Sequence, residues 1–232
     1  MRKLTWLLAV TAMFVSGGAY ASNVMSTGGG VGVLNDTYDG SCGDLLFNAD
    51  GTYENGYAWA YGGTYAPYYG AFAEKYDTNR KVCSVVMDLT QTGNQAGRTC
   101  DLYVWEDASG VPGPVLGVAF GHDPGTVAFW PSISRHVGSV TANCSSTDAT
   151  WVGYWGSWVD QIAAWFVTAD LDGFGGSPFT CIAPGIGYPT GWNNVSIVWG
   201  PTQALGLGAE FVDCDVVPVE NKTWGAIKSL YK

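Results

Sequence analysis

The acidic residues are the first candidates for chemistry, because glycoside hydrolysis needs two carboxyl groups on either side of the bond that is cut. The close pairs are Glu106 with Asp107, Asp170 with Asp172, and Asp213 with Asp215. Glu106 and Asp107 fall in a predicted turn, where acidic side chains are common without catalysis. We therefore assign no catalytic residue and keep an extracellular polysaccharide-degrading glycoside hydrolase as the alternative hypothesis.

Two oxygen-rich loops could hold a hard cation. The sequence Asp170-Leu171-Asp172-Gly173 places alternate carboxylates ahead of a glycine, and a second loop carries Asn48, Asp50 and Glu54. Calcium prefers several such oxygen ligands. Neither loop has the full EF-hand pattern, and ordinary Asx turns use the same residues. Structural calcium at Asp170 and Asp172 is the one cofactor hypothesis that these loops support.

The histidines carry no recognisable catalytic pattern. His122 and His136 are the chain's two histidines, and no Gly-x-Ser-x-Gly elbow accompanies them. Two histidines without cysteine pairs at zinc spacing do not make a zinc site, and a serine nucleophile needs a positioned base. We interpret both histidines as loop or edge residues.

Aromatic side chains are the most suggestive feature. One stretch holds Tyr57, Trp59, Tyr61, Tyr65, Tyr68 and Tyr69. Exposed rings with a few polar partners stack on sugars or drive protein association, and the glycines and alanines around this stretch are too small to cover its rings. We predict that these residues form a ligand-binding platform. A second group, Trp151, Tyr154, Trp155 and Trp158, is interpreted as core, since aromatic side chains often fill cores.

The N-terminal segment and the cysteines indicate export. Arg2 and Lys3 precede an apolar run from Leu4 to Val15, and Ala19-Tyr20-Ala21 matches a signal-peptidase site, so we expect residues 1–21 to be removed. An exported chain with an even number of cysteines is expected to form disulfides. The candidates are Cys42, Cys83, Cys100, Cys144, Cys181 and Cys214. Their pairing stays open, because spacing alone does not select partners.

The charge excludes some partners. The net charge is −10, and removal of Arg2 and Lys3 would make it −12. A nucleic-acid-binding surface needs excess positive charge, so we expect no nucleic-acid partner. No segment after the signal has an apolar run long enough to cross a bilayer, so we expect no membrane span in the mature chain.

The elements that must position these residues are short strands. In the hairpin from Thr99 to Phe120, Leu102 and Val104 face one way while Tyr103 and Trp105 face the other. Further strands are predicted at 71–76, 81–89, 151–158, 165–169, 195–199 and 204–213. Strands of this length between turn signals predict an all-β fold, an antiparallel β-sandwich of jelly-roll type. We divide the chain into a signal peptide (1–21), a flexible lead-in (22–40), the sandwich (41–215) and a linker with a C-terminal tail (216–232).

The C-terminal tail differs from the sandwich. Trp224, Ile227 and Tyr231 recur at helical spacing, and Lys222, Lys228 and Lys232 make this end basic. Two interpretations stay open: the tail docks on its own domain, or it is recognised by an export or attachment machinery.

The chain from Tyr69 to Phe211 resembles an uncharacterised β-sandwich module of bacterial secreted proteins. The segments that carry the resemblance are YYGAFAEKY, VWEDASGVPGPVLG, WVGYWGSW, ADLDGFGGSP, IAPGIGYPTGW and LGLGAEF. The tail PVENKTWGAIKSLYK resembles short C-terminal tails of exported bacterial proteins. The resemblance implies a fold and an extracellular location, but no catalytic residue, because one fold serves many functions.

These observations lead to one hypothesis about function. We expect a secreted, non-enzymatic β-sandwich protein that acts in attachment at the cell surface or outside the cell. It would bind a glycan or associate with other copies of itself.

Overall fold

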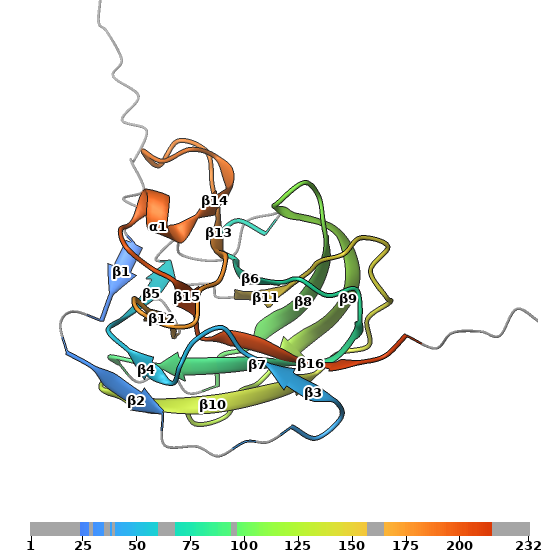
Figure 1. The fold of residues 1–232 in the computed structure, drawn as a ribbon. Helices are drawn as coiled ribbons and strands as arrows, with labels where there is room; N and C mark the ends of the chain where they lie inside the picture. The colour runs from blue at the N-terminus through green and yellow to red at the C-terminus, as the bar shows by residue number, and fades with distance from the viewer. Residues whose placement is uncertain are drawn as a thin grey trace, which may run out of the picture.

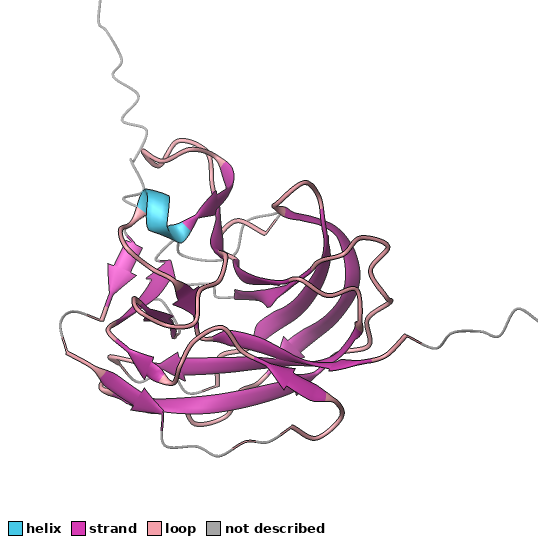
Figure 2. Ribbon diagram, in the orientation of Figure 1, coloured by secondary structure: helices cyan, strands magenta, loops and turns pink. Residues whose placement is uncertain are grey.

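The protein is a β-sandwich in a computed structural model that describes residues 24–27, 30–34, 38, 40–59, 68–93, 97–156 and 165–214. Two sheets, mostly antiparallel, lie one above the other (Figures 1 and 2). The prediction of an all-β antiparallel sandwich is confirmed. The predicted signal peptide and the tail residues Trp224, Ile227 and Tyr231 lie outside the described residues. Among the described residues no helix is long and apolar enough to cross a membrane.

The six-stranded sheet has the order β14-β13-β6-β11-β8-β9, and every neighbouring pair in it is antiparallel. Its strands are β6 (Phe72–Tyr76), β8 (Cys100–Asp107), β9 (Pro112–His122), β11 (Thr150–Gly156), β13 (Pro178–Ile182) and β14 (Gly191–Asn194). The central hairpin predicted from the sequence is β8 and β9.

The ten-stranded sheet follows the order β1-β5-β12-β7-β10-β2-β4, with β15, β16 and β3 attached to this path. Its strands are β1 (Val24–Ser26), β2 (Gly32–Leu34), β3 (Asp44–Leu46), β4 (Thr52–Tyr53), β5 (Asn55–Trp59), β7 (Lys81–Thr90), β10 (Ser132–Ser139), β12 (Phe166–Asp170), β15 (Ala204–Leu205) and β16 (Leu207–Val212). One pair in it, β10 with β2, is parallel.

The main core fills the space between the sheets. Leu102 and Val104 of β8 are buried there, together with Met87 and Leu89 of β7. Side chains of a strand alternate between its two faces, so Tyr103 and Trp105 must lie on the opposite face of the six-stranded sheet. They belong to a separate apolar cluster, which confirms the predicted division of side chains in the hairpin.

One predicted strand is a helix. We predicted a strand at Val195–Trp199, but Val195–Val198 forms the helix α1. The Asn194 side chain accepts a hydrogen bond from the N–H of Ser196 and caps the helix. Gly200, at φ +118, and the following proline end the turn. The β-branched residues favoured a strand, and the local cap overrides that propensity.

The predicted flexible lead-in at residues 22–40 is wrong for two short segments. β1 pairs with β5, and β2 pairs with both β10 and β4. These residues therefore extend the ten-stranded sheet. Short polar and glycine-rich strands carry little apolar periodicity, which is why the sequence did not predict them.

Two disulfides join distant segments. Cys42 bonds to Cys83, and Cys144 bonds to Cys214. The disulfide prediction is therefore confirmed for four of the six cysteines, and such bonds are typical of oxidising compartments. Cys100 and Cys181 are buried thiols, and burial raises the pKa of both, that of Cys181 to about 12. They lie on β8 and β13, which β6 and β11 separate in the sheet order.

A buried ion pair ties β7 to β10 on the far side of the ten-stranded sheet. Arg135 Nε and Nη2 each donate to a carboxylate oxygen of Asp88 at 2.7 Å, and the Asp88 side chain is fully buried. Tyr53 of β4 donates its hydroxyl to the same carboxylate. Burial raises the pKa of Asp88, while Arg135 opposes this change. Such a pair specifies which strands meet, because either partner alone would be an uncompensated buried charge.

We predict that Arg135→Met destabilises the fold strongly. The substitution leaves the fully buried Asp88 carboxylate without its cationic partner, and we expect the free energy of unfolding in urea to fall by about 3–5 kcal/mol. The matched control is Asp77→Asn, which breaks an exposed ion pair with Lys75 (side-chain exposure of Asp77 86%) and should cost less than about 1 kcal/mol. Equal costs for the two variants would contradict this role of Arg135.

Candidate functional site

The outer face of the six-stranded sheet, the side turned away from the main core, is covered with aromatic rings. We call this set the aromatic face; its rings are Tyr68, Tyr103, Trp105, Trp151, Trp155, Phe179 and Trp192. Strand register brings them together, because Trp151 is paired with Trp105 and, on its other side, with Lys75. The small residues Ala73 and Gly153 are likewise paired and leave room between the rings.

The sheet curls toward the aromatic face. β13, β6 and β11 separate β14 from β8 in the sheet order, yet the ring centroids of Trp192 and Trp105 are 5.4 Å apart. Neighbouring strands are spaced by about 4.8 Å, so a flat sheet would keep these rings much farther apart. Figure 1 shows β8 and β9 curving on the right of the molecule. Trp105 also stacks on Tyr103, with centroids 5.1 Å apart and planes at 10°.

One buried polar atom in the aromatic face lacks a hydrogen-bond partner within the described part of the chain. Trp151 donates its indole N–H to Asp107 at 2.8 Å, and Trp155 donates to the Tyr69 carbonyl at 3.1 Å. Trp105 is fully buried, and its Nε1 has no hydrogen-bond partner among the described residues. A buried N–H without an acceptor costs about 1–3 kcal/mol. Tyr68, Trp155, Phe179 and Trp192 around it are half-buried, so parts of their rings reach solvent.

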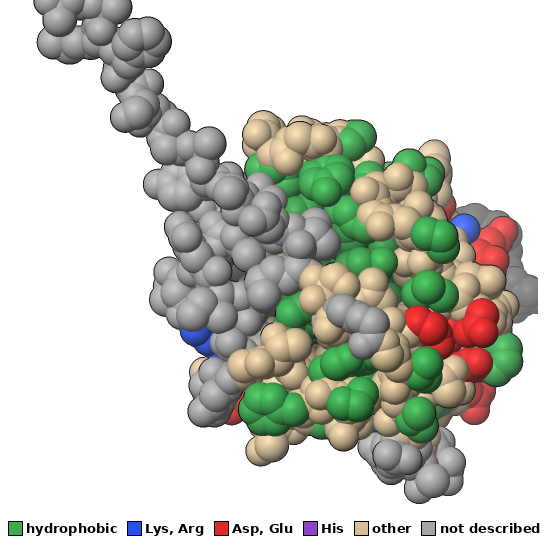
Figure 3. Space-filling view, turned by 90° about the vertical axis from the view of Figure 1, so that its left-hand side faces the viewer, with side chains coloured by type: hydrophobic (Ala, Val, Ile, Leu, Met, Phe, Trp, Pro, Cys, Tyr) green, Lys and Arg blue, Asp and Glu red, His purple; other side chains and the backbone are tan. Residues whose placement is uncertain are grey.

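The structure corrects the predicted platform at two positions. Tyr57 and Trp59 of β5 are 5% and 2% exposed, so neither presents a ring to solvent. Trp199, which follows α1, covers both, with ring centroids 5.0 Å from Tyr57 and 4.8 Å from Trp59. Trp59 donates its indole N–H to Thr180 at 2.7 Å. In Figure 3, hydrophobic side chains gather on the upper part of this side of the molecule, where α1 lies; Ile197 of α1 is 84% exposed.

The other predicted platform residues divide into two groups. Tyr61 and Tyr65 lie outside the described residues. Tyr68 and Tyr69 are half-buried, and Tyr68 packs its ring against Tyr103 at 5.0 Å and Trp155 at 6.0 Å. Tyr68 is therefore the one predicted platform residue that the structure places in the aromatic face.

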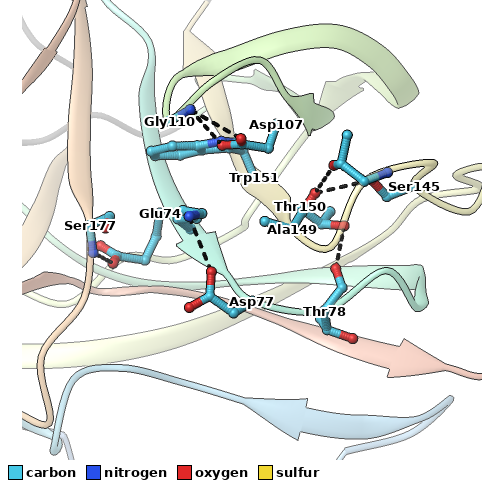
Figure 4. A network of polar contacts seen from close by, with 12 residues as sticks. Glu74, Asp77, Thr78, Asp107, Gly110, Ser145, Ala149, Thr150, Trp151 and Ser177 are labelled. Carbon is cyan, nitrogen blue, oxygen red and sulfur yellow. Dashed lines mark hydrogen bonds and ion pairs between the residues drawn. The ribbon is translucent and has the colours of Figure 1, made fainter.

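A second candidate is a polar pocket beside the buried carboxylate of Glu74. Glu74 Oε1 accepts hydrogen bonds from Asn48 Nδ2 at 3.0 Å and from the Ser177 N–H at 2.6 Å. Its Oε2 accepts from the Leu205 N–H at 2.9 Å. This carboxylate therefore connects β6 to β15 of the other sheet and to two loops. Figure 4 shows Ser177, Asp77 and Trp151 around the end of β6 that carries Glu74.

The pocket has a volume of about 430 Å³ and is lined by Asn48, by residues 75–77 and by residues 175–177. Glu74 lies behind this lining, fully buried. Gly176 makes the arrangement possible, because a Cβ there would lie 2.2 Å from Glu74 Oε1 and 2.9 Å from Asn48 Nδ2. Burial raises the pKa of Glu74 from 4.5 to about 7, although its N–H donors act in the opposite direction.

The two oxygen-rich loops do meet. Asp50 donates its N–H to Asp170 Oδ2 at 2.8 Å, and Leu171 donates its N–H to Glu54 Oε2 at 2.9 Å. Carboxylate oxygens of Glu54, Asp170 and Asp172 lie within 4.8 Å of one another. Asp170 is fully buried, and both of its oxygens accept backbone N–H groups, Oδ1 from Asp172. Through these hydrogen bonds the Asp170 carboxylate holds the two loops together without a metal ion. Calcium binding here stays a prediction.

His136 belongs to a serine–imidazole pair that the sequence reasoning missed. Ser134 Oγ lies 2.7 Å from His136 Nε2, and the Pro124 carbonyl lies 2.7 Å from Nδ1. A carbonyl only accepts, so Nδ1 carries a proton, and in the neutral imidazole Ser134 then donates to Nε2. Ser134 Oγ also accepts from the Ala128 N–H at 2.9 Å. The pair therefore holds the segment before β10 against that strand. Ser134 and His136 are two residues apart and so share one face of a strand, which is the sequence signal that could have predicted the pair.

The acidic pair Glu106–Asp107 supports turns. Ser146 donates both its N–H and its hydroxyl to Glu106, and these bonds lower the pKa of Glu106. Asp107 accepts from Trp151 and from the Gly110 N–H at 3.0 Å. Of the remaining candidates, Asp213 is paired with Arg80 at 3.1 Å, and Asp215 lies outside the described residues.

We predict that Glu74 makes stability depend on pH. A folded-state pKa of about 7 against an unfolded value of 4.5 means that the folded state binds more protons in this interval, so stability falls as the pH rises from about 4.5 to about 7, by about 3 kcal/mol in all. Glu74→Gln cannot ionise. The stability difference between wild type and Glu74→Gln should therefore shrink or reverse over this interval in urea titrations. Parallel pH profiles for the two proteins would contradict the prediction.

Comparison of the chain with models of protein families, with curated proteins and with solved structures found no match. The function must therefore be argued from the two sites themselves. The resemblance to a bacterial secreted module and its tail stays a prediction, whereas the β-sandwich that the resemblance implied is present.

Proposed function

We propose that this chain is a secreted, non-catalytic attachment protein that binds a glycan through its aromatic face. The aromatic face combines half-buried rings with a few polar groups, which is the composition of sites that take sugars. The flat apolar side of a sugar ring packs on an aromatic ring, while its hydroxyl groups need hydrogen-bond partners.

The indole N–H of Trp105 is the observation that carries this proposal. It is buried in the aromatic face without an acceptor among the described residues. Indole N–H is a donor only, so the group that satisfies it must bring an oxygen or another acceptor. A sugar hydroxyl brings that acceptor together with an apolar ring face, and because Trp105 is 0% exposed, the hydroxyl reaches the N–H only when a half-buried ring packed on it, such as Trp192 or Tyr68, moves aside. A purely apolar protein surface would leave the N–H unsatisfied.

The carboxylates support binding better than hydrolysis. A glycosidase needs one carboxyl that gives a proton to the leaving group. Glu106 accepts a hydrogen bond from the Ser146 N–H, and Asp107 accepts one from the Trp151 indole N–H. Glu74 has a raised pKa, but it is fully buried and accepts hydrogen bonds from N–H groups of Asn48, Ser177 and Leu205. Polysaccharide hydrolysis stays the alternative, and reducing-sugar release from mixed glycans tests it.

Attachment outside the cell fits the rest of the chain. The N-terminal segment matches a signal peptide, and disulfides suit an oxidising compartment. We propose that the tail with Trp224, Ile227 and Tyr231 is the segment that an export or attachment machinery recognises.

We predict that glycan binding depends on the half-buried rings. Purified protein is screened on a glycan array, and affinities for the bound glycans are measured by calorimetry. Trp155→Ala and Tyr68→Ala should each weaken binding by about tenfold, since an aromatic stacking contact contributes about 0.5–1.5 kcal/mol beyond the area that it buries. Trp105→Phe keeps an aromatic ring and removes the N–H, so it should weaken binding by about tenfold.

The control is Phe129→Ala, which removes a ring that is 55% exposed in the segment before β10 of the other sheet and should leave affinity unchanged. Binding that ignores all three substitutions, or no binding to any glycan, would refute the proposal. Concentration-dependent assembly without glycan binding would instead favour self-association, the other form of attachment.

A further inference from the structure

The polar pocket lies at one end of the aromatic face. Lys75 lines the pocket, and in strand register it is the neighbour of Trp151, which in turn is paired with Trp105. Paired residues of adjacent strands point to the same face of a sheet. Lys75 is therefore the residue that links the ring-covered surface to the pocket.

The pocket wall offers donors and acceptors side by side. Lys75 Nζ is 3.1 Å from Asp77 Oδ1 and has three hydrogens to donate. Ser177 gives its N–H to Glu74 and is one of the residues that line the pocket. Asn48 uses its amide N–H groups on Glu74 and on the Lys75 carbonyl, which leaves its oxygen as an acceptor. Hydroxyl groups, which both donate and accept, match such a wall.

The charges argue against an anionic ligand. The one cation of the lining, Lys75, is already balanced by Asp77, and the whole chain carries −10. A carboxylate or sulfate entering the pocket would meet Asp77 and an overall negative field. The volume of about 430 Å³ is near the lower end of small-molecule sites, which span about 300–1,000 Å³. The pocket thus suits one compact, uncharged, hydroxyl-rich unit.

We propose that this pocket is a subsite for one neutral hexose unit of the glycan, whose neighbouring units stack on the aromatic face. The inference rests on the proposed function and narrows the glycan to the neutral class. Lys75 and Asp77 together hydrogen-bond adjacent hydroxyl groups, and Ser177 binds a third. Glu74 fixes the wall from behind by holding Asn48 and Ser177, so it acts as a positioning residue.

The test compares neutral and anionic sugars on matched variants. Probes are hexasaccharides of glucose, mannose and galactose, with the galacturonic-acid hexasaccharide as the charged counterpart of the galactose probe. Affinities are measured by calorimetry at low and at high salt. Lys75→Met and Ser177→Ala should each weaken binding of the preferred neutral probe by about tenfold. Lys81→Met, which removes the same charge from the first residue of β7, should leave affinity unchanged.

The outcomes separate this inference from the proposed function. The subsite is contradicted if the uronate binds more tightly than its neutral counterpart. It is also contradicted if binding of the neutral probe depends on Trp155 but is unchanged in Lys75→Met and Ser177→Ala. In both cases the glycan-binding proposal still stands. No binding of any hexasaccharide or array glycan overturns both. Circular dichroism confirms that each variant is folded, and loss of affinity with an unchanged spectrum supports the subsite.

Discussion

The period of two along a β-strand is the constraint on which the rest of this structure depends, because the six-stranded sheet is apolar on both faces. Leu102 and Val104 are buried in the core between the sheets, and Tyr103 and Trp105 are carried to the outer side. The second sheet covers the apolar side chains of the inner face. The rings of the outer face bury one another, because the curl of the sheet brings them into contact. In our proposal the ligand supplies the hydrogen-bond acceptor for the Trp105 N–H.

Glu74 connects this constraint to the second half of the candidate site. The same alternation points Glu74 inward between its outward neighbours Ala73 and Lys75. A buried carboxylate without hydrogen-bond partners would destabilise the fold. Glu74 is stabilised by N–H groups from three places: the turn at Asn48, the loop before β13, and β15. The loops that supply these donors form the wall of the pocket. A structural requirement of the sandwich therefore shapes a polar recess next to an aromatic surface.

The sequence predicted what periodicity controls and missed what tertiary contacts control. The hairpin of β8 and β9 and the separation of Tyr103 from Leu102 follow from alternation alone. The aromatic platform was placed wrongly at Tyr57 and Trp59, because the neighbouring glycines and alanines say nothing of Trp199, far along the chain, which covers both rings. The interpretation of Trp151 and Tyr154 as core is confirmed, because both are fully buried, Tyr154 in the main core and Trp151 in the cluster on the outer face, where the half-buried Trp155 packs against it. Trp158 lies outside the described residues. The role of Glu74 could not be predicted from the sequence, because the N–H groups that stabilise its carboxylate come from the distant residues 48, 177 and 205.

The central claim is that the Trp105 N–H awaits a sugar acceptor, and nuclear magnetic resonance of the indole N–H groups tests it most directly. Trp105→Phe identifies the Trp105 signal, and the Trp59 signal serves as an internal reference because that N–H already donates to Thr180. On titration with the preferred neutral hexasaccharide, our account predicts that the Trp105 signal moves to a saturating new position while the Trp59 signal stays. A Trp105 signal that does not move while the sugar binds would contradict it.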